Sequence, residues 1–225
     1  AVREAADELK RDLGYRGLHS GRVLFLEGNP EAVRQGKRFI DVNLNRQFTD
    51  SKLVNSYDTK VHELRVARSL YRLFGKADFL LDLHTSDEAT PPFLICDQPK
   101  KILEPYLNWW PEGVEYILTG LDYYHPGSTD GYMNKKGKLG FCIECGQKDD
   151  PKSKDVGKDA IYRVLFNQHH FQSNYMIPAF RESPKVKTLQ ASYIHNCSFD
   201  FEPYVSCDEF TLVSEGDLMG WDGGV

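Results

Sequence analysis

The pattern of apolar and polar positions along the chain predicts strands that alternate with helices. Continuous apolar runs over residues 78–86, 91–98, 115–121 and 139–146 have the length and composition of buried strands. A further short strand is expected over residues 22–30. Helical spacing of apolar residues is found over residues 1–13, 61–74 and about 155–175, with a short helical piece at 31–35. Such an alternation predicts an α/β sheet that is covered by helices on both faces.

The boundaries of the helices and domains follow from local residue types. Asp58 is expected to cap the helix over residues 61–74, and Gly75 is expected to end it. After Pro178 and Pro184 the chain changes to short apolar runs separated by turn residues, without a helical period. We therefore predict an α/β domain over residues 1–180 and a small β domain over residues 181–225.

The composition and net charge limit the classes of protein to which this chain can belong. The chain has 225 residues, of which 40% are hydrophobic and 27% charged, as expected of a globular protein. The net charge of −5 and the absence of a long basic block argue against a nucleic-acid surface. No apolar run reaches the roughly 20 residues that span a bilayer, and no signal peptide is visible. We therefore expect that the protein binds neither nucleic acid nor a membrane. It could form a homo-oligomer.

Cysteine usage indicates a reducing compartment. Five cysteines at irregular spacing do not form a disulfide framework, so reduced thiols and a cytoplasmic location are the simplest interpretation. Cys142 and Cys145 form a C-x-x-C pair within an apolar run. Because side chains alternate along a strand, we expect the two thiols on opposite faces, which disfavours a redox or zinc-knuckle motif.

Three polar clusters stand where ligands of α/β proteins gather, beyond the carboxyl ends of strands. The first is the run FIDVNLNRQF over residues 39–48, which has neither helical nor strand periodicity and reads as a loop. The second holds His84 and Asp82, which share a face because they are two residues apart, so Asp82 could fix the imidazole of a metal-binding His84. The third holds Glu144 in an otherwise apolar strand. The ordinary alternatives are a hydrogen-bonded structural histidine and a carboxylate paired with a nearby cation.

Arg38, Asn45 and Arg46 form a candidate carboxylate clamp. A guanidinium group binds a carboxylate through two parallel hydrogen bonds and can also stabilise a developing oxyanion. Asn45 would add a neutral donor. The alternative for both arginines is a solvated surface position.

The motifs KRFIDVNLNRQF, LDLHTS and IECGQ occur in this order, and together they resemble the succinylglutamate desuccinylase/aspartoacylase family of the zinc carboxypeptidase clan. The similarity extends over most of the chain, including a C-terminal segment similar to the family's small β domain. The resemblance implies a mixed central sheet flanked by helices, and zinc-dependent hydrolysis of the amide bond of an N-acyl amino acid that carries a carboxylate.

The resemblance also implies a role for each matched residue. His84 matches a zinc ligand, and Glu144 matches the general base that acts on a zinc-bound water. Arg38 matches an arginine that polarises the scissile carbonyl. Asn45 and Arg46 match an Asn-Arg pair that holds a substrate carboxylate. The expected cofactor is therefore Zn²⁺, and the expected partner is a small-molecule N-acyl amino acid.

The sequence departs from the family pattern at the metal site. The family binds zinc through an additional H-x-x-E pair, and none of the seven histidines here has a glutamate three residues later. We expect these two ligands upstream of Ala1. The alternatives are a metal-free binding protein that retains the clamp, or a metallocarboxypeptidase acting on peptide C-termini. Asn134 stands where some family members have an arginine, so the specificity for the acyl group and the amino acid stays open.

Overall fold

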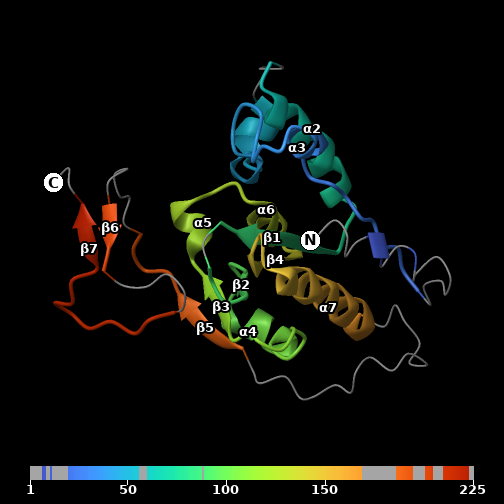
Figure 1. The fold of residues 1–225 in the computed structure, drawn as a ribbon. Coiled ribbons are helices and arrows are strands. Elements are labelled where there is room, and N and C mark those ends of the chain that lie inside the picture. The colour runs from blue at the N-terminus through green and yellow to red at the C-terminus, as the bar shows by residue number, and fades with distance from the viewer. Residues whose placement is uncertain are drawn as a thin grey trace.

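The computed structural model describes residues 7–8, 11, 20–55, 60–87, 89–168, 186–194, 201–204 and 210–222. A five-stranded sheet lies at the centre of the molecule in the order β1-β4-β2-β3-β5 (Figure 1). Its strands are β1 (Phe79–Ser86), β2 (Phe93–Ile95), β3 (Tyr116–Thr119), β4 (Leu139–Gln147) and β5 (Lys187–Gln190). β2 is antiparallel to β4, and the other neighbouring pairs are parallel. The mixed α/β sheet that the sequence predicted is confirmed.

Helices cover both faces of this sheet, as the alternation of elements predicted. Against β1 and β4, α6 (Thr129–Lys135) lies on one face and α7 (Pro151–Asn167) on the other. The remaining helices are α2 (Pro30–Arg34), α3 (His62–Phe74), α4 (Lys100–Leu103) and α5 (Leu121–Tyr124). Short 3-10 turns occupy Leu44–Arg46 (η1) and Glu104–Tyr106 (η3), and a π turn occupies Ser51–Asn55 (η2). Among the described residues, no helix is both long enough and apolar enough to cross a membrane.

Alternation along β4 divides the hydrophobic core between the two faces. Phe141, Ile143 and Cys145 pack on the α7 side, where Trp110 is also fully buried. On the opposite side, Leu80 of β1 packs against a cluster contributed by α3, α6 and the segment before α3 (Phe48, Leu53, Ala67, Leu70, Phe74, Tyr132 and Met133). The polar side chains of β1 and β4 share this second face with α6.

Two thiols follow the same alternation. The Cys145 sulfur faces Gly157 of α7, whereas Cys142 lies beside His84 and Glu144 on the other face. Burial raises the pKa of Cys142 well above its usual value and that of Cys145 to about 12. Both sulfurs are therefore protonated, poorly reactive thiols in this environment.

The boundaries of several predicted helices are refined by the structure. α2 begins at Pro30 with Asn29 as its N-cap, and the chain turns at Gly36, which has a positive φ of 62°. α3 ends at Gly75 as predicted. The predicted cap Asp58 lies outside the described residues, and the carboxylate that accepts from the His62 backbone N–H is that of Asp41. α7 starts at Pro151, earlier than expected, because Asp150 provides an N-cap.

Two predictions near the N-terminus have different outcomes. The predicted helix over residues 1–13 is described only at residues 7, 8 and 11, which are helical. The predicted strand over residues 22–30 is wrong for the described chain, since residues 22–28 join no ladder. Val23 and Phe25 nevertheless pack against α7, while Leu24 and Leu26 are exposed. Burial thus alternates over residues 23–26 as it would along a strand, but no described strand pairs with this segment.

The C-terminal region contributes to two sheets. β5 joins the main sheet by pairing with β3, and a separate two-stranded sheet consists of β6 (Phe201–Pro203) and β7 (Gly220–Asp222). Figure 1 shows this small sheet lying away from the central one. The predicted boundary near residue 180 lies outside the described residues, so the division into 1–180 and 181–225 stays a prediction.

Candidate active site

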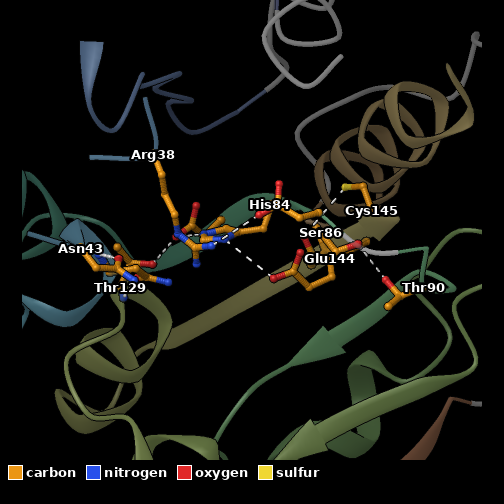
Figure 2. Close-up of polar contacts among 12 residues, drawn as sticks. Arg38, Asn43, His84, Ser86, Thr90, Thr129, Glu144 and Cys145 are labelled. Atoms are coloured by element: carbon orange, nitrogen blue, oxygen red, sulfur yellow. Dashed lines mark hydrogen bonds and ion pairs between the residues drawn. The ribbon is translucent and has the colours of Figure 1, made fainter. Parts of the chain in front are cut away.

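The pairing of β1 with β4 brings His84 and Glu144 together. These residues are register partners on neighbouring parallel strands, so their side chains leave the same face of the sheet. The His84 Nδ1 atom lies 3.9 Å from Oε1 of Glu144 (Figure 2). Two residues that are far apart in the sequence thus meet where both strands approach their carboxyl ends.

Asp82 holds the other side of the His84 ring. Its Oδ2 atom lies 3.1 Å from His84 Nε2. The negative charge of Asp82 raises the pKa of His84 to about 9, although burial of the ring acts in the opposite direction. In the neutral form of the ring, an Nε2–H that donates to Asp82 leaves the Nδ1 lone pair directed toward Glu144, which is the orientation that a metal ligand needs.

Glu144 contributes a carboxylate with an unused oxygen. Its Oε2 atom is buried and has no hydrogen-bond partner among the described residues. Burial raises the pKa of Glu144, and the charges of His84 and Arg38 counteract this only in part. A buried oxygen without a partner is costly, so this atom fits a site that holds a further polar group.

The donor atoms at this place fit a divalent cation. His84, Cys142 and Glu144 each offer one ligand atom, and these atoms lie within 4.8 Å of one another. An imidazole nitrogen and a carboxylate oxygen are donor types that zinc accepts, whereas Cys142 would first have to lose its proton. The described part of the chain therefore supplies a candidate His/Glu site, in which the resemblance matched His84 to a zinc ligand and Glu144 to the general base.

Arg38 reaches the same place from the loop before η1. Figure 2 shows its side chain extending toward the ring of His84. The guanidinium group lies 3.9 Å from a carboxylate oxygen of Asp87, whose other oxygen accepts from Lys148 at 2.8 Å. Both side chains of the Arg38–Asp87 pair are largely exposed, so this ion pair contributes little to stability. Arg38 thus lies next to the candidate site, and the described carboxylate with which it pairs is that of the exposed Asp87.

Asn45 and Arg46 lie against the start of α6 and the residues just before it. The Asn45 side chain accepts from the backbone N–H of Thr129 at 2.9 Å, and the Arg46 guanidinium donates to the Asn45 carbonyl at 2.6 Å. Gly127 has a φ of 99°, and a Cβ there would lie 2.7 Å from the Arg46 carbonyl oxygen. Part of the predicted clamp therefore serves the local structure, with the Asn45 amide nitrogen and the rest of the guanidinium as the remaining donors.

Glu63 of α3 anchors the loop between Arg38 and Asn43. Its side chain is fully buried and accepts four hydrogen bonds, from the backbone N–H groups of Ile40, Asp41 and Val42 and from the Asn29 side chain, at 2.6–3.1 Å. Burial by itself would raise the pKa of this carboxyl group, but the four donors lower it to about 2. The loop that presents the candidate clamp is thus fixed by an ionised carboxylate beneath it.

Asn134, which stands where some family members have an arginine, makes contacts within the fold. Its side chain bonds the backbone of Gly140 in both directions and approaches the Cys96 sulfur, so it holds α6 against the start of β4. A cavity of about 450 Å³ lies on this side of α6, lined by Asp97, Asp122, Tyr123, Gly131, Asn134 and Lys135. None of these residues belongs to the candidate site.

Sequence reasoning missed Glu63 and Thr129. Glu63 had a recognisable signal, because it precedes the buried residues Ala67, Leu70 and Phe74 at helical spacing and so lies on the apolar stripe of α3. Thr129 lies in α6, a helix the sequence analysis did not predict. Ser128, which caps α6 by accepting from the Gly131 N–H, was the available signal.

Comparison with known proteins relates the chain to amide hydrolases. Residues 3–165 match the family model for the succinylglutamate desuccinylase/aspartoacylase catalytic domain. The succinylglutamate desuccinylase of Idiomarina loihiensis is 25% identical over 219 aligned residues, covering 90% of this chain and 63% of that protein. A probable aspartoacylase of Prochlorococcus marinus is 42% identical over 67 residues, 28% of this chain and 22% of that protein. The chain thus spans less than two thirds of the length of these two relatives.

Solved structures agree with the observed fold. The succinylglutamate desuccinylase of Vibrio cholerae superposes with a TM-score of 0.70 at 21% identity, covering 99% of this chain and 67% of that one. Murine aminoacylase 3 superposes with a TM-score of 0.54 at 23% identity, covering 74% of this chain and 60% of that one. At these identities the superpositions establish a shared fold.

Proposed function

This chain belongs to the succinylglutamate desuccinylase/aspartoacylase family, and we propose that its complete gene product hydrolyses the amide bond of an N-acyl amino acid that carries a carboxylate. The family is one of zinc-dependent amidohydrolases, and the described residues include a candidate His/Glu site. The substrate class and the residue roles below are our proposal.

His84 would hold zinc through Nδ1, with Asp82 fixing the ring through Nε2. When bound, zinc supplies Lewis acidity, which polarises a carbonyl group and lowers the pKa of water. Asp82 accepts the Nε2–H and so keeps the imidazole in the tautomer that binds metal.

Glu144 is the proposed general base. Its raised pKa brings the carboxyl group nearer to the working pH, where a base can accept a proton and later return it to a leaving amine. The unpartnered Oε2 atom is available for this transfer without breaking a described hydrogen bond. Glu144 therefore takes a proton from water and delivers it to the amine product.

Arg38 and the Asn45/Arg46 pair are the proposed substrate-binding groups. The exposed Arg38 guanidinium lies close enough to influence the charge of Glu144 and would stabilise the oxyanion that forms from the amide carbonyl. Arg46 and the Asn45 amide would bind the substrate carboxylate. Because guanidinium groups bind carboxylates through paired hydrogen bonds, Arg38 and Arg46 would favour a substrate that carries a carboxylate.

The observation that carries the proposal is the convergence of His84 and Glu144, with a buried carboxylate oxygen that no described group satisfies. The test is to purify the complete gene product, measure its zinc content, and follow amine release from N-acyl glutamate, N-acyl aspartate, N-acyl leucine and a blocked dipeptide. We expect hydrolysis of the acidic N-acyl amino acids. Cleavage of the dipeptide alone would support a carboxypeptidase, and binding without hydrolysis would support a metal-free binding protein.

A further inference from the structure

Thr129, the first residue of α6, bonds two parts of the candidate site at once. We propose that Thr129 is a positioning residue that orients the zinc-binding His84 through Asp82 and couples it to the loop of the carboxylate clamp. This inference rests on the proposed function and adds a residue that the family motifs do not include. Thr129 touches neither His84 nor the proposed substrate position in any described contact, so its effect is transmitted through Asp82.

The side chain of Thr129 acts on the metal side. Its hydroxyl donates to Oδ2 of Asp82 at 2.5 Å, the same oxygen that lies 3.1 Å from His84 Nε2. A carboxylate held by two donors at one oxygen has less freedom to rotate than one held by the imidazole alone. Thr129 is 8% exposed, so water would not readily replace its hydroxyl. The Thr129 hydroxyl therefore orients the Asp82 carboxylate, which in turn orients the His84 ring.

The backbone of Thr129 acts on the substrate side. Its N–H donates to the side chain of Asn45 at 2.9 Å. Thr129 is therefore the single residue between the proposed clamp and the hydrogen bonds that lead through Asp82 to His84. One residue thus connects the loop over residues 43–48 with β1. Figure 2 shows Thr129 lying between Asn43 of that loop and the His84 side of the site.

α6 provides a rigid base for this connection. Ser128 caps the helix, and its hydroxyl also donates to Asp122. A Cβ at Gly140 would lie 2.6 Å from the Asp130 carbonyl oxygen, so the first turn of α6 lies directly on β4 with no side chain between them. A small shift of Thr129 is therefore resisted by backbone packing, and its hydroxyl keeps a fixed place relative to β1 and β4.

The test uses the complete gene product and measures zinc affinity by competition with a chelator, together with kcat and KM on the best acidic N-acyl amino acid. Thr129→Val removes the hydroxyl at nearly constant volume, and Thr129→Ser restores it. Thr119→Val is the matched control, because Thr119 is also buried and its hydroxyl donates to Leu189 and Gln190 in β5, away from Asp82.

We expect Thr129→Val to weaken zinc binding by about tenfold, at the lower end of what the loss of an outer-shell partner costs. At saturating zinc, kcat should fall while KM stays within about twofold, because the backbone bond to Asn45 is retained. Thr129→Ser should recover wild-type zinc affinity, and Thr119→Val should leave it unchanged.

Three results would overturn the positioning role: unchanged zinc affinity in Thr129→Val, failure of Thr129→Ser to restore it, or an equal loss in Thr119→Val. Zinc binding without hydrolysis of any N-acyl amino acid would refute the proposed function and leave the positioning role standing. A wild-type protein that binds no zinc would refute both.

Discussion

Replacing Glu63 by glutamine tests how the loop of the candidate site is held. The change keeps the size of the side chain but removes its charge and replaces one acceptor oxygen with an N–H₂ donor. Three backbone N–H groups and the Asn29 amide then face a side chain that cannot accept from all of them. We expect the free energy of unfolding to fall substantially, because buried donors are left without acceptors.

The expected loss in the free energy of unfolding follows from the pKa of Glu63. The four donors, acting against the opposing effect of burial, lower it from 4.5 to about 2. Since one pKa unit is worth about 1.4 kcal/mol, ionisation of Glu63 contributes about 3 kcal/mol to stability at neutral pH. The depressed pKa gives the sign: the contribution is complete above about pH 4.5 and is lost as the pH falls toward about 2.

The assay is urea unfolding of the wild-type protein and of Glu63→Gln between about pH 7 and pH 3. The variant should be less stable by about 3 kcal/mol at neutral pH, and the difference should shrink as the pH falls below about 4.5. Glu112→Gln, in an exposed turn, is the matched control and should change stability by less than about 0.5 kcal/mol.

Two results would refute this reasoning. A loss below about 1 kcal/mol at neutral pH would mean that the four hydrogen bonds to Glu63 add little net stability. A difference that stays constant from pH 7 to pH 3 would mean that the charge of the carboxylate is not what matters. Either result would also remove the argument that Glu63 fixes the loop carrying the clamp.

The remaining predictions concern catalysis and the backbone near the clamp. Glu144→Gln should lower kcat by about 10²- to 10⁴-fold while zinc content stays the same, and retained activity would exclude Glu144 as the general base. Arg46→Ala should raise KM for carboxylated substrates far more than for uncharged analogues, so an equal rise for both would exclude the clamp. Gly127→Ala should destabilise the protein by about 2 kcal/mol in urea unfolding, since its φ is 99° and its Cβ would meet the Arg46 carbonyl. Gly137→Ala, with a φ of 71° and open space around it, should cost less, and equal losses would show that no clash occurs at Gly127.

The strands and long helices could be predicted because their apolar periods extend over enough residues to be distinctive. β1, β2 and β3 fall within predicted runs, β4 extends one residue beyond its run, and α3 ends at the predicted glycine. α6 was not predicted, because seven residues cover fewer than two helical turns and one of them is Gly131. A strand was expected over residues 22–30 from its apolar residues, but strand formation also requires a hydrogen-bonding neighbour, which a single segment of sequence does not reveal.

The residues of the candidate site that lie at strand ends could be predicted from the sequence. Those whose side chains form hydrogen bonds with the backbone of distant segments could not. His84 and Glu144 could be placed together because the carboxyl ends of neighbouring parallel strands meet at one edge. The double use of Asn45, as a candidate clamp and as the acceptor for the Thr129 N–H, depends on a contact between segments 84 residues apart. Such contacts follow from packing, and no local spacing in the sequence encodes them.

The register between β1 and β4 also governs how errors in folding would affect chemistry. Because side chains alternate, a slip of one residue would turn Glu144 toward α7 and set Ile143 opposite His84. The same slip would remove Phe141 and Ile143 from the hydrophobic core under α7 and bury the Glu144 carboxylate there instead. Molecules with the wrong register would therefore be both inactive and unstable. The apolar face of the sheet thus selects the register that the candidate site on the other face requires.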